Sequence, residues 1–383
     1  MKGRGRRPAK ERSPDGTDMK ERDHRLSNIR AIACMAVVVL HTFFAFASMA
    51  GAGSWDYTAT FVVRNLMFWA VPCFVMVTGA LLLNPNKRVG YGKVLTKYIP
   101  RMVVALVLFS GIFYAIDVAC GFTQLSSETV RDLLKSLVTG QGLWSHMWYL
   151  YTMIALYLLI PLLNPLLRLG KKTAAAASVV LFVFLSVLPM LSKLLDISFS
   201  FYLPLHTIYP LFLLLGGVLG CDVKAADGGE GGGNTNDADS VNAPAAPADE
   251  ALAHGRIWGI LGTSVFAIGM VILTILYTRN DMPELKALVS DYSFPLTVVG
   301  AVGVFLLIRS FKGTNKVLTF IDQNSFGIYL LHMIPLKILV MKKVFNPYST
   351  CMWTLLPVAV GVFVAALLVT WLLRKIPIVR KLL

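Results

Sequence analysis

The sequence predicts an all-α membrane protein, a polytopic bundle of about ten transmembrane helices with both termini in the cytoplasm. Of its 383 residues, 56% are hydrophobic and only 15% are charged. Apolar runs of about 20 residues, long enough to cross a bilayer as helix, recur along the chain. Because lipid offers no partners to the backbone, such runs must satisfy their own hydrogen bonds, and this favours helices.

The apolar runs place the spans near 27–49, 61–83, 100–119, 147–167, 173–191, 202–220, 256–278, 291–309, 317–341 and 352–373. Lys and Arg gather on the N-terminal tail and on the segments after the second, fourth, eighth and tenth spans, whereas 50–60 holds neither. Cytoplasmic loops carry such an excess of cations. This alternation predicts that both termini face the cytoplasm.

The domain organisation follows from composition. We expect a disordered basic tail at 1–26, a membrane domain at 27–373 and a short cytoplasmic tail at 374–383. The segment 221–253 is rich in Gly, Ala, Asp and Pro, so it cannot form a core and is predicted to be a disordered cytoplasmic linker. In the external segment 121–146, a Ser before a helical pattern predicts a short interfacial helix.

The composition does not favour a nucleic-acid-binding protein, a disulfide-rich protein or a metalloprotein. The net charge of +15 does not indicate nucleic-acid binding, because the cations follow membrane topology. The five cysteines are scattered without a CxxC pair, so they indicate neither zinc nor a disulfide framework. No metal site is expected, since no two histidines lie at i,i+4 on one helix.

The first span begins with the stretch RAIACMAVVVLH, from Arg30 to His41. Eleven positions on a helix return to within about 20° of the starting direction and rise about 16 Å, so both residues share one face. Arg30 is then at the inner headgroup level, and His41 is in the outer half of the membrane. Ionisable residues inside a span often mark function, although a snorkelling arginine and a packed histidine would also explain this pair.

Other histidines fall at the depth of His41. His332 lies about 15 residues into a span that starts in the cytoplasm, while His146 and His206 lie near the outer ends of theirs. Imidazoles gathered at one depth could provide a general base. For His332, packing or substrate contact remains the alternative to catalysis.

Cations gather at the inner mouths of the first and third spans: Arg30, Lys93, Lys97 and Arg101. They could hold the phosphates of an anionic cofactor, or they could simply reflect topology. At the other side, the stretch HMWYLYTMIALYLLIPLL places His146, Trp148 and Tyr149 at the outer interface. They could form an aromatic belt or contact a sugar acceptor. Small residues in 71–83 and 213–220 permit close contacts between helices.

Taken in order, these motifs resemble the acyltransferase 3 family of integral membrane O-acyltransferases. They are the Arg-x10-His pair, PxFxxxxG in the second span, WYLYTMIALYLLIPLL in the fourth, a Gly-rich end to the sixth, and SFGIYLLH in the ninth. The resemblance covers the chain from about Arg25 to Leu373. It is nearest to the subclass of surface-polysaccharide and enterobacterial common antigen O-acetyltransferases, which carry no appended hydrolase domain.

The resemblance implies transfer of an acyl group, usually acetyl, from cytoplasmic acyl-CoA to a hydroxyl of an extracytoplasmic glycan, in a bacterial plasma membrane. It makes Arg30 and His41 the essential pair, with His41 as general base. The family also carries Arg-x-x-Arg at the third span, where this chain has KYIPR, so Arg101 matches and Tyr98 replaces the first arginine.

From these patterns we expect acyl-CoA to contact Arg30, Lys97 and Arg101, and the acceptor to contact His332, His146, Trp148 and Tyr149. Acetyl-CoA is expected as a co-substrate and no permanently bound cofactor is expected. The competing hypothesis is a multi-pass transporter or flippase for a glycan precursor or small solute. Such a protein should show buried acidic residues and paired interrupted spans, and the sequence offers few of either.

Overall fold

The structure is a computed structural model that describes residues 24–47, 53–84, 89–197, 207–220, 248–311, 313, 315–344 and 351–383. Throughout these ranges the regular structure is helical, without strands. The predicted tail up to residue 23, most of the predicted linker (221–247) and His206 lie outside the described residues.

The first half of the chain forms α1 (His24–Ala47), α2 (Trp55–Leu66), α3 (Ala70–Leu82), α4 (Tyr91–Lys93), η1 (Val94–Tyr98), α5 (Ile99–Ala119), α6 (Ser127–Thr139), η2 (Ser145–Met147), α7 (Trp148–Arg168), α8 (Lys171–Phe182), η3 (Val183–Val187) and α9 (Leu188–Leu195). The second half forms α10 (Tyr209–Gly220), α11 (Ala248–Arg279), α12 (Pro283–Val289), α13 (Pro295–Arg309), α14 (Lys316–Leu331), α15 (Met333–Met341), α16 (Met352–Leu373) and α17 (Pro377–Leu382).

In the described part of the chain, eight helical segments are long and apolar enough to cross a membrane. The shorter apolar helices α10 and α13 occupy the predicted sixth and eighth spans. The all-helical membrane fold is therefore confirmed, while the number of ten spans and the side of each terminus stay predictions.

Two of the spans are broken, and one boundary differs from expectation. The second divides into α2 and α3 around Met67–Trp69, and the ninth divides into α14 and α15 at His332. Helix α11 begins at Ala248, so the last six residues of the predicted linker, ADEALA, are helical. Ala, Leu and Glu favour helix, and this local preference outweighs the composition of the preceding segment.

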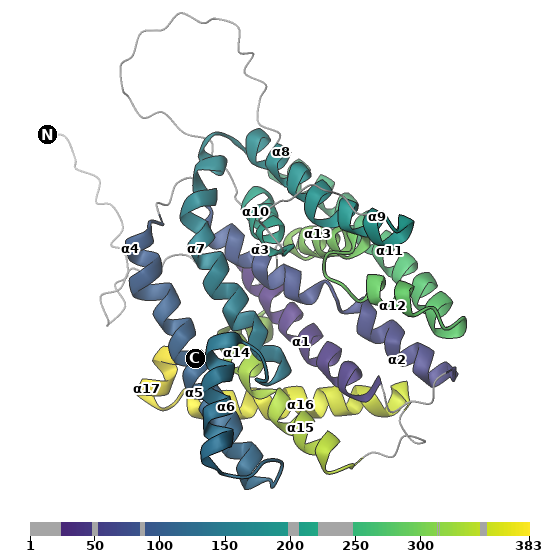
Figure 1. Ribbon diagram of the computed structural model, residues 1–383. Coiled ribbons are helices and arrows are strands. Elements are labelled where there is room, and N and C mark those ends of the chain that lie inside the picture. Colours follow the sequence, from purple (N-terminus) through teal and green to yellow (C-terminus); the bar gives the residue numbers. More distant parts are fainter. Residues whose placement is uncertain are drawn as a thin grey trace, which may run out of the picture.

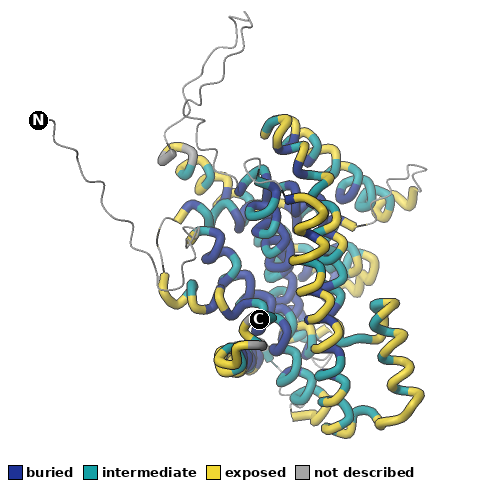
Figure 2. The backbone as a smooth tube through the Cα atoms, turned by 90° about the vertical axis from the view of Figure 1, so that its left-hand side faces the viewer, coloured by how far each residue is buried: buried dark blue, intermediate teal, exposed yellow. Residues whose placement is uncertain are grey.

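Helix α1 runs through the middle of the bundle, where it packs against α2, α3, α13, α14, α15 and α16 (Figure 1). Buried positions concentrate along these central helices, and exposed positions lie on the outer ones (Figure 2). Many exposed side chains on α5, α11 and α16 are large and apolar, as expected of surfaces that face lipid. Arg30 and His41 of α1 are thus surrounded largely by other helices and not by lipid.

The predicted close contact between small residues is confirmed by α3 and α10, which pack against each other. A Cβ added to Gly79 would collide with the backbone of Leu213, and one added to Gly216 would collide with the backbone of Met76. Each glycine therefore lets the opposite backbone approach, as in other membrane helix pairs.

Replacing Gly216 with valine is expected to lower the free energy of unfolding by at least about 1–3 kcal/mol, because backbone cannot move aside as a side chain can. Unfolding in detergent, followed by apparent Tm, measures this. Gly361→Ala is the matched control, since a Cβ at Gly361 meets no atom within 4 Å. Equal losses of Tm in the two variants would contradict the packing argument.

The predicted short helix in the external segment is α6. Its N-cap is Ser126, whose hydroxyl accepts a hydrogen bond from the Thr129 backbone while the Thr129 side chain returns the contact. Gly140 ends it in the left-handed conformation, at φ 73°, which favours glycine. Helix α6 contributes no fully buried residue and packs on α5.

Candidate functional site

Helix α1 runs in the same direction as α14 and the following His332, with a register that is constant to within one residue. Three contacts join them: Arg30 with Asp322, Cys34 with the carbonyl of Ser325, and His41 with His332. The paired residues are 292, 291 and 291 positions apart. The face that carries Arg30 and His41 is therefore fixed along its length by one partner helix.

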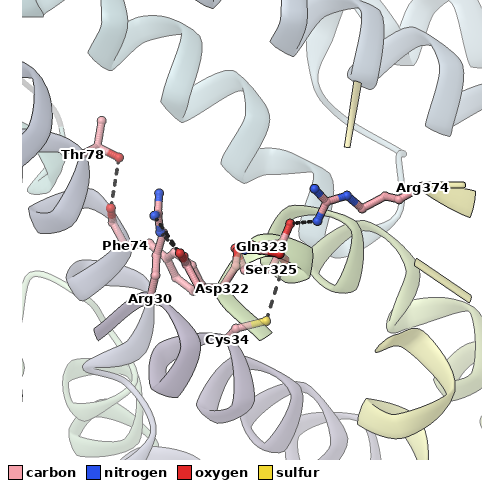
Figure 3. Close-up of polar contacts among 8 residues, drawn as sticks. All are labelled: Arg30, Cys34, Phe74, Thr78, Asp322, Gln323, Ser325 and Arg374. Carbon is pink, nitrogen blue, oxygen red and sulfur yellow. Dashed lines mark hydrogen bonds and ion pairs between the residues drawn. The ribbon is translucent and has the colours of Figure 1, made fainter. Parts of the chain in front are cut away.

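The first contact is a two-bonded ion pair, visible in Figure 3. Arg30 Nε lies 2.6 Å from Asp322 Oδ1, and Arg30 donates a second hydrogen bond to Oδ2 at 3.2 Å. The Asp322 side chain is completely buried, while that of Arg30 keeps 29% of its surface exposed. Asp322 is the one acidic residue in the buried set of the described chain, and Arg30 offsets its charge.

The third contact joins two imidazoles, and their backbone partners indicate which nitrogen carries the proton. His332 Nδ1 lies 3.0 Å from the Ile328 carbonyl, which can only accept, so Nδ1 carries the proton and Nε2 the lone pair. His41 Nδ1 lies 3.2 Å from that Nε2 and 3.0 Å from the Val37 carbonyl, so it donates to both. In the neutral His41 ring, Nε2 is then left as the basic nitrogen.

A third imidazole joins this pair. The ring centroid of His146 lies 5.6 Å from that of His332, and its Nε2 lies 3.3 Å from the Leu330 carbonyl. The same reasoning puts the proton on Nε2 and leaves Nδ1 as an acceptor. This Nδ1 is buried without a hydrogen-bond partner among the described residues. A buried acceptor in this state is costly unless a ligand satisfies it.

One cavity of about 440 Å³ connects these groups, and we name it the central cavity. The cations on its wall are Arg30, Arg101, Arg374 and Arg380. Its other polar and aromatic wall residues include His41, His146, Trp148, Tyr149, Tyr292 and Tyr329. A guanidinium-rich end suits phosphate groups, and an end with two basic imidazoles suits a hydroxyl that must lose its proton.

The central cavity brings together most of the residues predicted from sequence. Arg30, His41, Arg101, His146, Trp148 and Tyr149 all lie on its wall. Two predicted site residues do not border the cavity. Lys97 is exposed on η1, one turn before Arg101, and is not part of the cavity wall. His332 is fully buried and contacts His41, and its predicted contact with a substrate stays a prediction.

Several wall residues were not predicted as ligands. Arg374 and Arg380 carry charges that the sequence pattern assigns to topology, Asp322 lies within the predicted ninth span, and Tyr292 comes from the segment before α13. Arg374 donates to the carbonyl of Gln323, next to Asp322 (Figure 3). It also donates to Asn324 Oδ1 at 3.2 Å. Arg101 donates to the backbone oxygens of Leu382 and Leu383 at 3.1 and 3.2 Å.

Comparison with known families identifies the family of this chain. A family model described as an acyltransferase domain matches residues 23–375. The chain belongs to the acyltransferase 3 family. This acyltransferase 3 protein is therefore a membrane acyltransferase, as the resemblance in its motifs implied. Searches of curated proteins and of solved structures gave no significant match.

Proposed function

We propose that this protein is a membrane O-acyltransferase of a bacterial plasma membrane. It moves an acyl group, acetyl in the first instance, from cytoplasmic acyl-CoA to a hydroxyl of an extracytoplasmic cell-surface glycan. The observation that carries the proposal is the central cavity, with arginines on its wall at one end of α1 and His41 with His146 at the other. Its nearest functional subclass is the surface-polysaccharide O-acetyltransferases.

The donor enters at the arginine end. The phosphates of acyl-CoA contact Arg101, Arg374 and Arg380, whose planar guanidinium groups match phosphate oxygens. The thin pantetheine arm then passes Arg30 and follows α1 for about 16 Å, which is the rise of eleven helical residues. The thioester carbonyl reaches His41.

The acceptor meets the donor at the imidazoles. His146 Nδ1 accepts a hydrogen bond that orients the acceptor, and Trp148 and Tyr149 line its path. His41 Nε2 takes the proton from the attacking hydroxyl as its oxygen bonds to the thioester carbon. The C–S bond then breaks, and the protonated His41 returns its proton to the leaving CoA thiolate. The products are a glycan ester and free CoA.

The test uses proteoliposomes that contain the purified full-length chain, with envelope glycan inside and acetyl-CoA carrying a labelled acetyl group outside. We expect label to enter the glycan as an ester that mild base releases, and only in vesicles with protein. Glycan that crosses the membrane without gaining label would instead support the transporter hypothesis and contradict this one.

Alanine variants of Arg101 and Lys97, which lie four residues apart, allow a matched comparison of the KM for acetyl-CoA. Arg101→Ala is expected to raise the KM for acetyl-CoA about tenfold or more, because it removes a charge-assisted phosphate contact from the cavity wall. Lys97→Ala should change KM less than about twofold, since Lys97 lies off the cavity. Initial rates against acetyl-CoA concentration measure both, and equal effects would contradict this placement of the donor.

A further inference from the structure

A second cavity lies beside the central one, between α5, α6 and the segment before η2. It has a volume of about 210 Å³, and we name it the α6 cavity. Helix α5 borders it with Ser110, Phe113, Tyr114 and Asp117, and α6 borders it with Thr129, Asp132, Leu133 and Ser136. Each set has the spacing i, i+3, i+4 and i+7, so two helices present facing stripes.

These stripes are polar where packing would call for apolar residues. Hydroxyls and carboxylates predominate, and no Lys or Arg borders the α6 cavity among the residues described. Asp117 pairs with Lys337, whose Nζ lies 2.6 Å from Oδ1, whereas Asp132 also borders the space and has no ion pair among the described residues. Such a wall repels an anionic headgroup and suits a neutral ligand rich in hydroxyls.

Ser110 gives an independent sign of a ligand. Its side chain is buried, borders the α6 cavity, and has no hydrogen-bond partner for Oγ in the described structure. Several helical hydroxyls in this bundle bond back to their own helix, as Thr42 does to the Val38 carbonyl at 2.8 Å. Others share the state of Ser110 among the described residues, but of this set only Ser110 borders the α6 cavity; the others are Ser27, Thr60, Thr263 and Thr297. A ligand in this cavity could supply the hydrogen bond that the Ser110 hydroxyl does not make to its own helix.

The wall between the two cavities is aromatic and firmly held. Trp144 stacks on Phe113 with ring centroids 4.3 Å apart, and its Nε1 donates to Asp117 Oδ2 at 3.0 Å. The His146 ring lies 5.3 Å from Phe113 and 6.4 Å from Trp144, and it borders the central cavity. The α6 cavity is thus separated by one layer of rings from the imidazoles proposed to act on the acceptor.

We propose that the α6 cavity is the site where one neutral sugar ring of the acceptor glycan binds. This inference rests on the proposed function and adds the location and charge of the ring that is recognised. The volume is below the roughly 300 Å³ at which drug-sized pockets begin, so it accommodates one ring with its hydroxyls. The neighbouring part of the glycan then extends past Trp144 toward His146.

The experiment uses the full-length chain in detergent and neutral oligosaccharides released from the envelope glycan by mild acid. Saturation-transfer NMR measures their binding, and transfer assays measure KM for the glycan. Leu133→Trp fills the cavity and is expected to weaken binding and raise this KM at least about tenfold. Leu134→Trp is the matched control, because Leu134 is the next residue, is 59% exposed and does not border the cavity.

Ser110→Ala tests the same site without adding bulk. The variant removes a buried hydroxyl that has no hydrogen-bond partner among the described residues, so the apparent Tm should stay equal or rise, while sugar binding weakens about two- to tenfold. A purely structural serine would give the opposite pattern. Unchanged KM for acetyl-CoA in all three variants shows that the donor site is intact.

The outcomes separate this inference from the proposed function. Sugar binding that Leu133→Trp abolishes, in a protein that transfers no acyl group, supports the site and contradicts the function. Acyl transfer with equal glycan KM in Leu133→Trp and Leu134→Trp overturns the site and leaves the function standing. Tighter binding of glycerol phosphate than of neutral sugar also overturns the site, because it reverses the charge argument.

Discussion

Replacing His41 with alanine is expected to reduce the rate of acyl transfer about 10²–10⁴-fold, the range that a positioned general base contributes. The expectation follows from the proton positions in the imidazole pair. His332 accepts from His41 Nδ1, so Nε2 is the nitrogen left to take a proton from the acceptor. The measurement is kcat with saturating acetyl-CoA and glycan, together with the apparent Tm of the purified variant.

The matched control is His254→Ala, since His254 is an exposed histidine on α11. It should transfer acyl groups at the wild-type rate. His332→Ala should fall between the two, because it removes the acceptor that orients His41 without removing the base. A His41→Ala variant that folds normally and keeps more than about a tenth of the activity would refute the assignment of the base.

The ion pair of Arg30 with Asp322 is expected to show the second large effect, on stability. Arg30→Ala takes the arginine from a carboxylate whose side chain is fully buried, and breaking a buried pair in this way costs about 3–5 kcal/mol. Asp322→Ala should cost less, because the Arg30 side chain is 29% exposed and can reach polar surroundings. Unfolding in detergent measures both.

A double variant tests whether Arg30 and Asp322 are energetically coupled. The Arg30→Ala, Asp322→Ala variant should lose less free energy of unfolding than the two single variants together, since the second change removes the charge stranded by the first. Lys193→Ala is the comparison outside the site: its pair with Asp291 is long, 3.4 Å, and both side chains are well exposed. That variant should lose no more than about 1 kcal/mol. Strictly additive losses for Arg30 and Asp322 would show that the pair is not coupled.

Regular geometry made part of the site predictable. The Arg30–His41 spacing defines a helix face without any tertiary information, and that face does line the central cavity. Depth within a span was enough to group His146 and His332 with His41, because membrane helices limit where a residue at a given depth can lie. Depth alone could not show that His146 borders the cavity whereas His332 is buried beside His41. That difference depends on the rotation of each helix about its axis, which packing sets.

Charges near the ends of spans were the hardest residues to assign. Arg374 and Arg380 stand where the positive-inside rule already accounts for them, so their positions carry no further signal. One clue did exist for Asp322: it precedes His332 by ten positions, close to the eleven that separate Arg30 from His41. The α6 cavity was beyond prediction, because it requires knowing that two polar stripes face each other.

The constant register of α1 with α14 has a consequence for how this protein can change during evolution. One inserted residue between Arg30 and His41 would rotate His41 by about 100° and turn its ring away from the cavity. A compensating insertion in α14 would restore the offset between the helices but not the orientation of the imidazole. The number of residues between Arg30 and His41 is therefore fixed by the geometry. We expect substitutions within this segment to be tolerated better than insertions or deletions.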